Sequence, residues 1–267
     1  MARILGLAGK KQSGKNTLCN FLHGYQLKSQ EIIDGFEITT EGELVLDTLV
    51  MGADGKEQRG KGIVDITRTD MDFAAWAVYN MWPYVKHYAF ADPLKDIATS
   101  LFEIPRNLLY GTDADKNTLT QYSWENMPIP VKGKKGKMTA REFIQYFGTE
   151  VCRAIKNDVW VQRTMTDITN EEPTIAIIAD VRFLNEVEAI QKAGGKVIKL
   201  TRSVDSDGHA SECELDKFDK FDAIIDNKDN TIEQSCNDIL KVLDGWGWLS
   251  KEVVQPKKNR QFTTAIK

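Results

Sequence analysis

Apolar residues in this chain are concentrated in short continuous runs. The runs cover residues 4–8, 85–89, 174–179, 197–200 and 223–225. Continuous runs, rather than strict alternation, are typical of strands buried on both faces, as in a parallel sheet. We therefore predict a strand at each run.

Helical patterns lie between these strands. They cover residues 14–26, 93–102, 139–156, 184–193 and 231–243. Thr139 with Glu142, and Thr231 with Gln234, have the spacing of capping boxes, and Gly194-Gly195 follows the fourth helix as a stop signal. Strands that alternate with helices predict a doubly wound α/β sheet.

Three segments depart from this alternation. Residues 34–69 alternate apolar and polar residues around glycines, which predicts β-hairpins inserted after the first helix, interpreted as a lid or docking insertion. Residues 113–137 are rich in Lys, Gly and Pro and predict a long functional loop. Residues 251–267 have little to bury and predict a flexible basic tail. We therefore expect a single domain over residues 1–250.

Composition limits the protein class. The chain has 267 residues, a formal net charge of -4 and 42% hydrophobic residues, which is close to the globular average and excludes a fibrous or wholly disordered protein. The acidic balance gives no overall reason to bind nucleic acid or an anionic membrane. No apolar run is long enough to span a membrane, so we expect a cytoplasmic protein; whether it forms a homodimer stays open. The four cysteines form no zinc-binding spacing and suggest reduced structural thiols.

The clearest motif is a phosphate loop at the first strand-to-helix junction. It reads Gly9-Lys-Lys-Gln-Ser13-Gly14-Lys15-Asn16-Thr17. The glycines allow backbone N–H groups to converge on a phosphate, and Lys15 is expected to reach the β and γ phosphates of ATP. The usual motif has Ser or Thr directly after the lysine; here that position is Asn16, and the hydroxyl follows at Thr17. A shift by one place is common in nucleoside monophosphate kinases.

The ends of two later strands supply one carboxylate and two guanidinium groups. Asp180 ends the third strand, Arg182 follows it, and Arg202 ends the fourth strand. An acidic residue beside a phosphate loop holds Mg²⁺ directly or through water, and a guanidinium binds phosphate in a bidentate manner. Asp180 alone would also serve as a helix cap.

A second anion site is predicted at Asp92-Pro-Leu-Lys95, after the second strand. The same residues also fit simple helix capping. His209, in the polar segment beyond Arg202, is either a phosphate ligand or a solvated loop residue.

Taken together, these residues resemble the deoxynucleoside monophosphate kinases of tailed bacteriophages. The likeness covers about residues 3–26 and 85–243 and excludes the insertion and the tail. Its segments are the phosphate loop, Phe90–Lys95, Gln145-Tyr-Phe-Gly-Thr-Glu150 with Trp160, Asp180-x-Arg182-x3-Glu186, and Arg202 with His209-x-Ser-Glu212.

The resemblance implies a P-loop kinase fold with five parallel strands in the order 2-3-1-4-5 and phosphoryl transfer from ATP to a deoxynucleoside monophosphate. Lys15, Arg182 and Arg202 would then be catalytic, and Thr17 and Asp180 would hold Mg²⁺. The acceptor side implied by the resemblance comprises Asp92, Lys95, Gln145, Glu150, Trp160, Arg182, His209 and Glu212. Gln145 and Trp160 are equally consistent with helix-surface and core positions.

Other nucleotide-binding classes fit less well. A GTP-binding switch needs Asn-Lys-x-Asp, whereas Asn227-Lys-Asp229 has its aspartate one place early. A packaging motor is expected to carry an acidic pair, but Val181 follows Asp180. A kinase for another small molecule, such as a nucleoside or a coenzyme precursor, and a non-catalytic nucleotide-binding module stay open.

Overall fold

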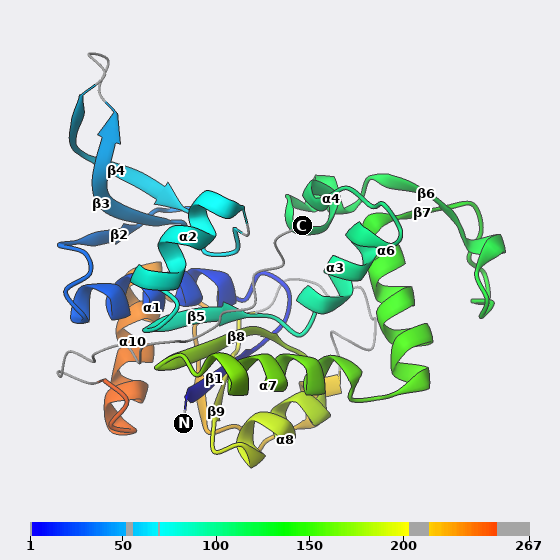
Figure 1. Cartoon of the computed structure of the whole chain (residues 1–267). Coiled ribbons are helices and arrows are strands. Elements are labelled where there is room, and N and C mark those ends of the chain that lie inside the picture. Colours follow the sequence, from blue (N-terminus) through cyan, green and yellow to red (C-terminus); the bar gives the residue numbers. More distant parts are fainter. Residues whose placement is uncertain (1, 52–55, 69, 203–213, 250–267) are drawn as a thin grey trace. The chain divides into compact units, whose positions relative to one another are not determined.

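Five parallel strands form the central sheet of the computed structural model, which describes residues 2–51, 56–68, 70–202 and 214–249 (Figure 1). The spatial order is β10-β9-β1-β8-β5. Numbered along the chain and read from β5, the five strands stand in the order 2-3-1-4-5. Their bounds are β1 Arg3–Ala8, β5 Val85–Tyr88, β8 Ile175–Val181, β9 Lys196–Leu200 and β10 Ala223–Ile225.

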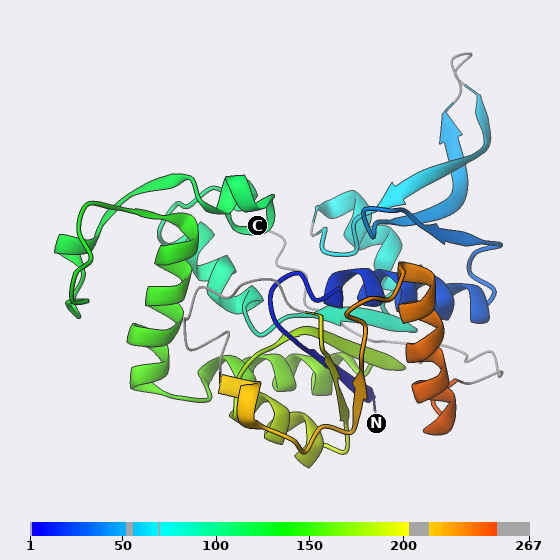
Figure 2. The same cartoon turned by 180° about the vertical axis from the view of Figure 1, so that it is seen from behind.

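Helices cover both faces of this sheet. Figures 1 and 2 show α1 (Lys15–Ser29) and α10 (Ile232–Gly245) on one face, and α8 (Leu184–Lys192) on the other. Leu5 and Leu7 of β1 join the buried cluster that contains α1 and α10 residues. A parallel sheet covered on both sides explains the continuous apolar runs. The prediction of an α/β fold with a five-stranded parallel sheet is therefore confirmed.

The described residues group into two compact units, where the sequence predicted one domain over residues 1–250. The first unit comprises residues 1–89 and 166–267 and the second residues 90–165, each taken without the residues that the structure does not describe. In the first unit, the segment between α1 and β5 forms a three-stranded antiparallel sheet and a helix: β2 Phe36–Ile38, β3 Leu44–Met51, β4 Glu57–Val64 and α2 Met71–Asn80.

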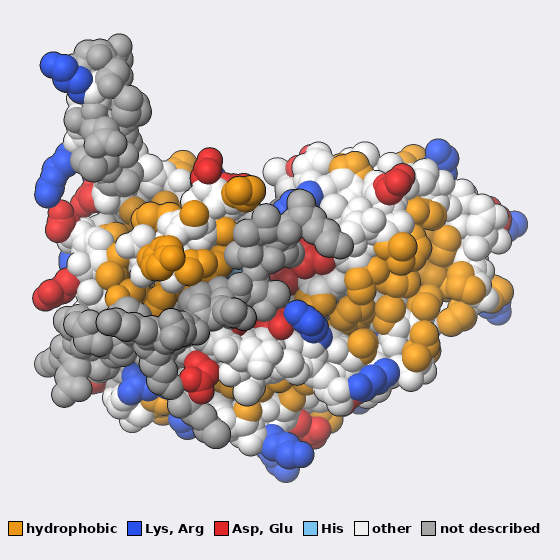
Figure 3. Space-filling model, in the orientation of Figure 1, with side chains coloured by type: hydrophobic (Ala, Val, Ile, Leu, Met, Phe, Trp, Pro, Cys, Tyr) orange, Lys and Arg blue, Asp and Glu red, His pale blue; other side chains and the backbone are white. Residues whose placement is uncertain are grey.

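Helix α2 was not predicted, because both of its faces carry apolar residues. Phe73 and Ala77 are buried, whereas Met71, Trp76 and Tyr79 are exposed. Hydrophobic side chains accordingly gather on the surface over α2 (Figure 3). Asp70 accepts a hydrogen bond from the amide of Phe73 and so fixes the start of the helix.

The second unit has its own core of aromatic and aliphatic residues, including Phe143, Tyr146 and Met138. Its elements are α3 Asp92–Ser100, α4 Arg106–Tyr110, α5 Asp113–Lys116, β6 Leu119–Ser123, β7 Lys137–Thr139, α6 Ala140–Gln145 and a π-helix Tyr146–Arg153. Helix α7 (Val159–Glu171) begins in this unit and ends in the first.

Two predictions need correction in the second unit. Residues 113–137 are not one long loop, because they include α5 and strand β6, which pairs with β7 in an antiparallel sheet. The helix predicted over 139–156 begins at the Thr139 capping box and continues to residue 155, but its central part, Tyr146–Arg153, is a π-helix rather than an α-helix. Wider π-helical turns occur often at functional sites.

Candidate functional site

The phosphate loop lies between β1 and α1, as its sequence predicted. Gly9 has a φ of 150° and Gly14 a φ of 91°, a conformation that residues with a Cβ rarely adopt. Gly14 stands immediately before α1 and has no side chain with which to cap the first turn. The N–H groups of that turn have no partners within the helix, so a bound phosphate would satisfy them.

Lys15 is folded across the loop. Its Nζ donates to the carbonyl oxygens of Gly9 and Lys10, both at 2.6 Å, and lies 3.3 Å from Ser13 Oγ. Its side chain is mostly buried. The ammonium group therefore lies against the backbone of the loop.

Thr17, in the first turn of α1, and Asp180, near the end of β8, are the residues expected to hold Mg²⁺. Strand β8 runs parallel to β1, with Val181 paired to Ala8, the residue before the loop. Mg²⁺ in nucleotide-binding proteins takes few protein ligands and is bound mainly by phosphates and water. A hydroxyl and a carboxylate are ligand types that such an ion takes.

Arg182 has its backbone fixed by Glu186 of α8. The buried Glu186 carboxylate accepts hydrogen bonds from the amides of Arg182, at 2.7 Å, and Phe183, at 3.0 Å. Glu186, the second acidic residue of the Asp180-x-Arg182-x3-Glu186 segment, thus sets the path of the chain between β8 and α8.

The sequence predicts that Arg202 places positive charge near the phosphate loop. In the structure, its guanidinium contacts the segment after β10. Its Nε donates to the carbonyl oxygen of Asn227 at 3.1 Å, and its Nη2 donates to that of Asn230 at 2.5 Å. The guanidinium therefore holds the turn after β10. These two hydrogen bonds use two of the five N–H donors of the guanidinium.

Sequence reasoning missed Asn227, which joins three parts of the site. Its Nδ2 donates to the carbonyl oxygen of Ser13 at 2.8 Å, and its Oδ1 accepts from the amide of Arg202 at 2.9 Å. The residue is almost completely buried. In the sequence, this segment resembles only a guanine-reading motif, and no sequence signal connects it to the phosphate loop.

In the second unit, two acceptor-side segments of the family resemblance, Phe90–Lys95 and Gln145–Glu150, lie together. Gly148, within the Gln145–Glu150 segment, approaches Leu94 so closely that an added Cβ would lie 2.5 Å from Leu94 Cδ2. The carbonyl oxygen of Gly148 accepts a hydrogen bond from the buried Trp160 indole at 3.2 Å. Trp160 thus supports the segment from the core, and Glu150 is exposed.

Lys95 and Asp92 are part of a charged cluster around Tyr110. The Lys95 ammonium lies 4.1 Å from the centre of the Tyr110 ring, and the Arg106 guanidinium lies 3.9 Å from it. Asp92 Oδ1 lies 3.5 Å from Lys95 Nζ and accepts a hydrogen bond from the Tyr110 hydroxyl at 3.2 Å. Burial, together with the neighbouring Asp92, raises the pKa of Asp96 above its usual value. These contacts give Lys95 a fixed position.

Some predictions concern residues that the structure does not describe. His209, Glu212 and the basic tail over 251–267 lie outside the described residues. The described cysteines Cys19, Cys152 and Cys236 are free thiols. Among the described helices, none is long and apolar enough to cross a membrane.

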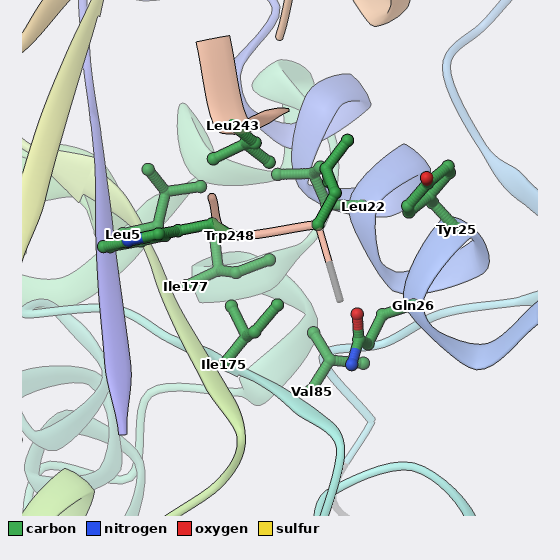
Figure 4. Close-up of a pocket in the computed structure, with 10 residues that line it drawn as sticks. Leu5, Leu22, Tyr25, Gln26, Val85, Ile175, Ile177, Leu243 and Trp248 are labelled. Carbon is green, nitrogen blue, oxygen red and sulfur yellow. The ribbon is translucent and has the colours of Figure 1, made fainter. Parts of the chain in front are cut away.

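A small cavity in the first unit lies away from the phosphate loop (Figure 4). Its volume is about 10 Å³, and Leu5, Leu22 and Ile177 are among its mostly apolar lining residues. Val85 and Ile175, also at its wall, begin β5 and β8, whereas the loop follows the end of β1. A space for about one water molecule is a packing defect rather than a nucleotide site.

A family model of deoxynucleotide monophosphate kinases matches residues 94–239, which include Lys95, Asp180, Arg182 and Arg202 but neither the phosphate loop nor the insertion. A protein of Acanthamoeba polyphaga mimivirus, provisionally assigned as a deoxynucleotide monophosphate kinase, is 29% identical over 170 residues, 58% of this chain and 81% of its own length. The match over residues 94–239, more than half of the chain, places it in the deoxynucleotide monophosphate kinase family.

Proposed function

We propose that this protein transfers the γ-phosphoryl group of ATP to a deoxynucleoside 5′-monophosphate, forming ADP and the deoxynucleoside diphosphate. The enzyme would serve deoxynucleotide biosynthesis and be encoded by a bacteriophage. The observation that carries the proposal is Lys15, which lies across a glycine loop at the start of α1 in a member of this family. The chemistry follows from the residues around it.

On the donor side, the loop from Gly9 to Gly14 would bind the ATP phosphates through backbone N–H groups and the N-terminal end of α1. The Lys15 ammonium would leave the carbonyl oxygens of Gly9 and Lys10 and bind the phosphates, exchanging neutral acceptors for charged ones. Thr17 and Asp180 would hold Mg²⁺, which neutralises phosphate charge when bound. Ser13 and Asn16 complete the proposed donor site.

In the reaction, an oxygen of the acceptor phosphate forms a bond to the γ-phosphorus. The bond from that phosphorus to the oxygen bridging it to the β-phosphate breaks, and ADP leaves with the electron pair. Little covalent work falls to the protein, so positioning and charge neutralisation dominate catalysis. Lys15, Arg182 and Arg202 are the proposed sources of positive charge.

On the acceptor side, Lys95 is the proposed phosphate ligand, with Asp92, Gln145 and Glu150 near it in sequence or structure. Its contacts with Asp92 and Tyr110 support this role, because they restrain a side chain that is otherwise flexible. A restrained cation loses less conformational entropy when a ligand binds. Trp160 supports this segment through Gly148, and His209 and Glu212 stay proposals from the family resemblance.

A coupled assay tests the reaction. The purified protein is incubated with ATP and Mg²⁺ and each ribo- and deoxynucleoside monophosphate in turn, and ADP and the diphosphate product are both measured. We expect ADP release to rise at least about a hundredfold with the correct deoxynucleoside monophosphate. Rapid ADP release without acceptor would contradict the proposal, and acceleration by an unphosphorylated nucleoside instead would assign the protein to another class of small-molecule kinase.

A further inference from the structure

The inserted β-sheet makes close contact with the first turns of α1. Its turn, residues 39–43, is closed by hydrogen bonds from the Thr39 amide to the Glu43 carbonyl oxygen and from the Gly42 amide to the Thr39 carbonyl oxygen, both at 3.0 Å. The Glu43 amide also donates to Thr39 Oγ1 at 3.2 Å. The turn is therefore a defined structure rather than a loose connection.

Gly42 of this turn lies directly against Thr17. A Cβ added to Gly42 would lie 2.3 Å from Thr17 Oγ1, 3.1 Å from Thr17 Cβ and 3.2 Å from Thr17 Cγ2. The three nearest atoms thus belong to one residue, Thr17, which is a proposed Mg²⁺ ligand. Gly42 also has a φ of 84°, which favours glycine.

Asn20 fixes the turn to the same side of the helix. Its Nδ2 donates to the carbonyl oxygen of Gly42 at 2.8 Å. Residues three apart on a helix are neighbours on its surface, so Thr17 and Asn20 form one contact area for the turn. Farther along α1, Phe36 of β2 packs against Phe21, with 5.7 Å between ring centres, and the buried Leu44 and Leu46 of β3 join the main core.

We propose that the insertion is part of the nucleotide-binding apparatus, and that Gly42 is a positioning residue that holds Thr17 and the first turn of α1 in place. This inference rests on the proposed function, because it gives Thr17 a role in binding the nucleotide. The β-branched Thr17 side chain has few rotamers in a helix, and the Gly42 backbone restricts them further. The insertion is thus more than the lid or docking element expected from the sequence.

The test substitutes Gly42 with a residue that carries a Cβ. Gly42→Ala introduces a clash with Thr17 and strain from a positive φ. Gly194→Ala is the matched control, because Gly194 has a φ of 78° and an added Cβ there meets nothing within 4 Å. Affinities for ADP and ATP are measured by calorimetry with and without Mg²⁺, beside thermal unfolding.

We expect Gly42→Ala to weaken nucleotide binding at least about tenfold and Gly194→Ala to change it by less than about twofold. Both variants should lose stability because of the positive φ, and Gly42→Ala should lose more because of the added clash. In a Thr17→Ala background, which removes two of the three clashing atoms, Gly42→Ala should have much less effect, since contacting residues are non-additive. Asn20→Ala removes only the hydrogen bond to Gly42 and should weaken nucleotide binding a few-fold. If Gly42→Ala does not fold, the affinity of Asn20→Ala tests the inference in its place.

Nucleotide binding by Gly42→Ala and Asn20→Ala at wild-type affinity would overturn the inference, as would an equal loss in the Thr17→Ala background. If the wild-type protein itself binds no nucleotide, the proposed function fails instead. A second readout is amide hydrogen exchange over residues 39–46. We expect ADP to slow this exchange in the wild type but not in Gly42→Ala; equal slowing in both would count against the inference.

Discussion

Asn227 Nδ2 donates to the carbonyl oxygen of Ser13 at 2.8 Å, which joins residues 214 positions apart in the chain. The same side chain accepts from the amide of Arg202. Two loops at the carboxyl edge of the sheet thereby depend on one buried amide for their hydrogen bonds. A residue outside the phosphate-loop motif, Asn227, therefore helps to fix the position of the loop.

Asn227→Ala should therefore destabilise the protein and weaken nucleotide binding. It leaves the Ser13 carbonyl oxygen and the Arg202 amide without this partner, at a cost of roughly 1–3 kcal/mol for each buried group. Urea unfolding measures the first effect and ADP titration the second. Gln191→Ala is the control, because the Gln191 side-chain amide donates to the carbonyl oxygen of Lys220 and to the Asp222 carboxylate on the surface. Equal stability loss in the two variants would contradict the role of Asn227.

Lys15→Ala should remove most of the turnover and leave the fold intact. Positioned charge on a transferring phosphoryl group contributes several kcal/mol, on the order of a thousandfold in rate. Lys10→Ala is the matched control on the same loop, because the Lys10 ammonium pairs with Asp216 at 3.2 Å. If Lys15→Ala kept near wild-type turnover at saturating substrates, the phosphate-loop assignment would be wrong.

Asp180→Asn and Arg182→Ala should fail in different ways. Asp180→Asn weakens a proposed Mg²⁺ ligand, so turnover should recover as the Mg²⁺ concentration rises. Arg182→Ala removes a proposed phosphate ligand, so turnover should stay low at every Mg²⁺ concentration. Mg²⁺ titrations of the initial rate separate the two. Unchanged kinetics with equal loss of thermal stability would mean that both residues are structural.

Lys95→Gln should raise the KM for the acceptor about tenfold, the effect of one charge-assisted hydrogen bond, with little change in the KM for ATP. Lys134→Gln is the control in the same unit. Lys134 also pairs with a carboxylate, Glu142 at 2.7 Å, and lies 5.2 Å from the Trp124 ring centre. Steady-state kinetics with each substrate varied gives both constants. A matching rise in both variants would argue against an acceptor site at Lys95.

His23 should make the protein less stable in mild acid. Burial, with a smaller contribution from the charge of His87, lowers the pKa of His23 from 6.5 to about 3, although its hydrogen bond to the Cys19 carbonyl opposes the shift. The unfolded chain binds a proton near pH 6.5, whereas the folded chain does not until about pH 3. This contribution to stability is therefore complete above about pH 7 and declines as the pH falls toward 3.

The size of this effect at pH 5 is about 2 kcal/mol, since the unfolded pKa lies roughly 1.5 units above that pH. Urea midpoints at pH 7.5, 6 and 5 measure it. His23→Gln, which does not titrate, should show a flatter dependence over this range. An identical pH dependence in the wild type and the variant would show that other groups cause the acid sensitivity.

The prediction of the central sheet succeeded because its signal is local. Each buried strand must be apolar along its own length, and the capping boxes at Thr139 and Thr231 need only four consecutive residues. The prediction failed where burial depends on partners distant in the chain. Strand β6 pairs with β7 across residues 124–136, and α2 carries exposed apolar residues that hide its helical period.

The sequence by itself determined the parallel sheet and the position of the predicted phosphate loop between a strand and a helix. It also showed which charged residues follow the strands. Each of these features depends on a few neighbouring residues. Only the tertiary structure decided that Asn227 supports Ser13, that the Arg202 guanidinium binds the 227–230 turn, and that Gly42 lies against Thr17. These contacts join residues 25 to 214 positions apart. Such pairs leave no periodic pattern in the sequence, because chain folding and not local propensity brings them together.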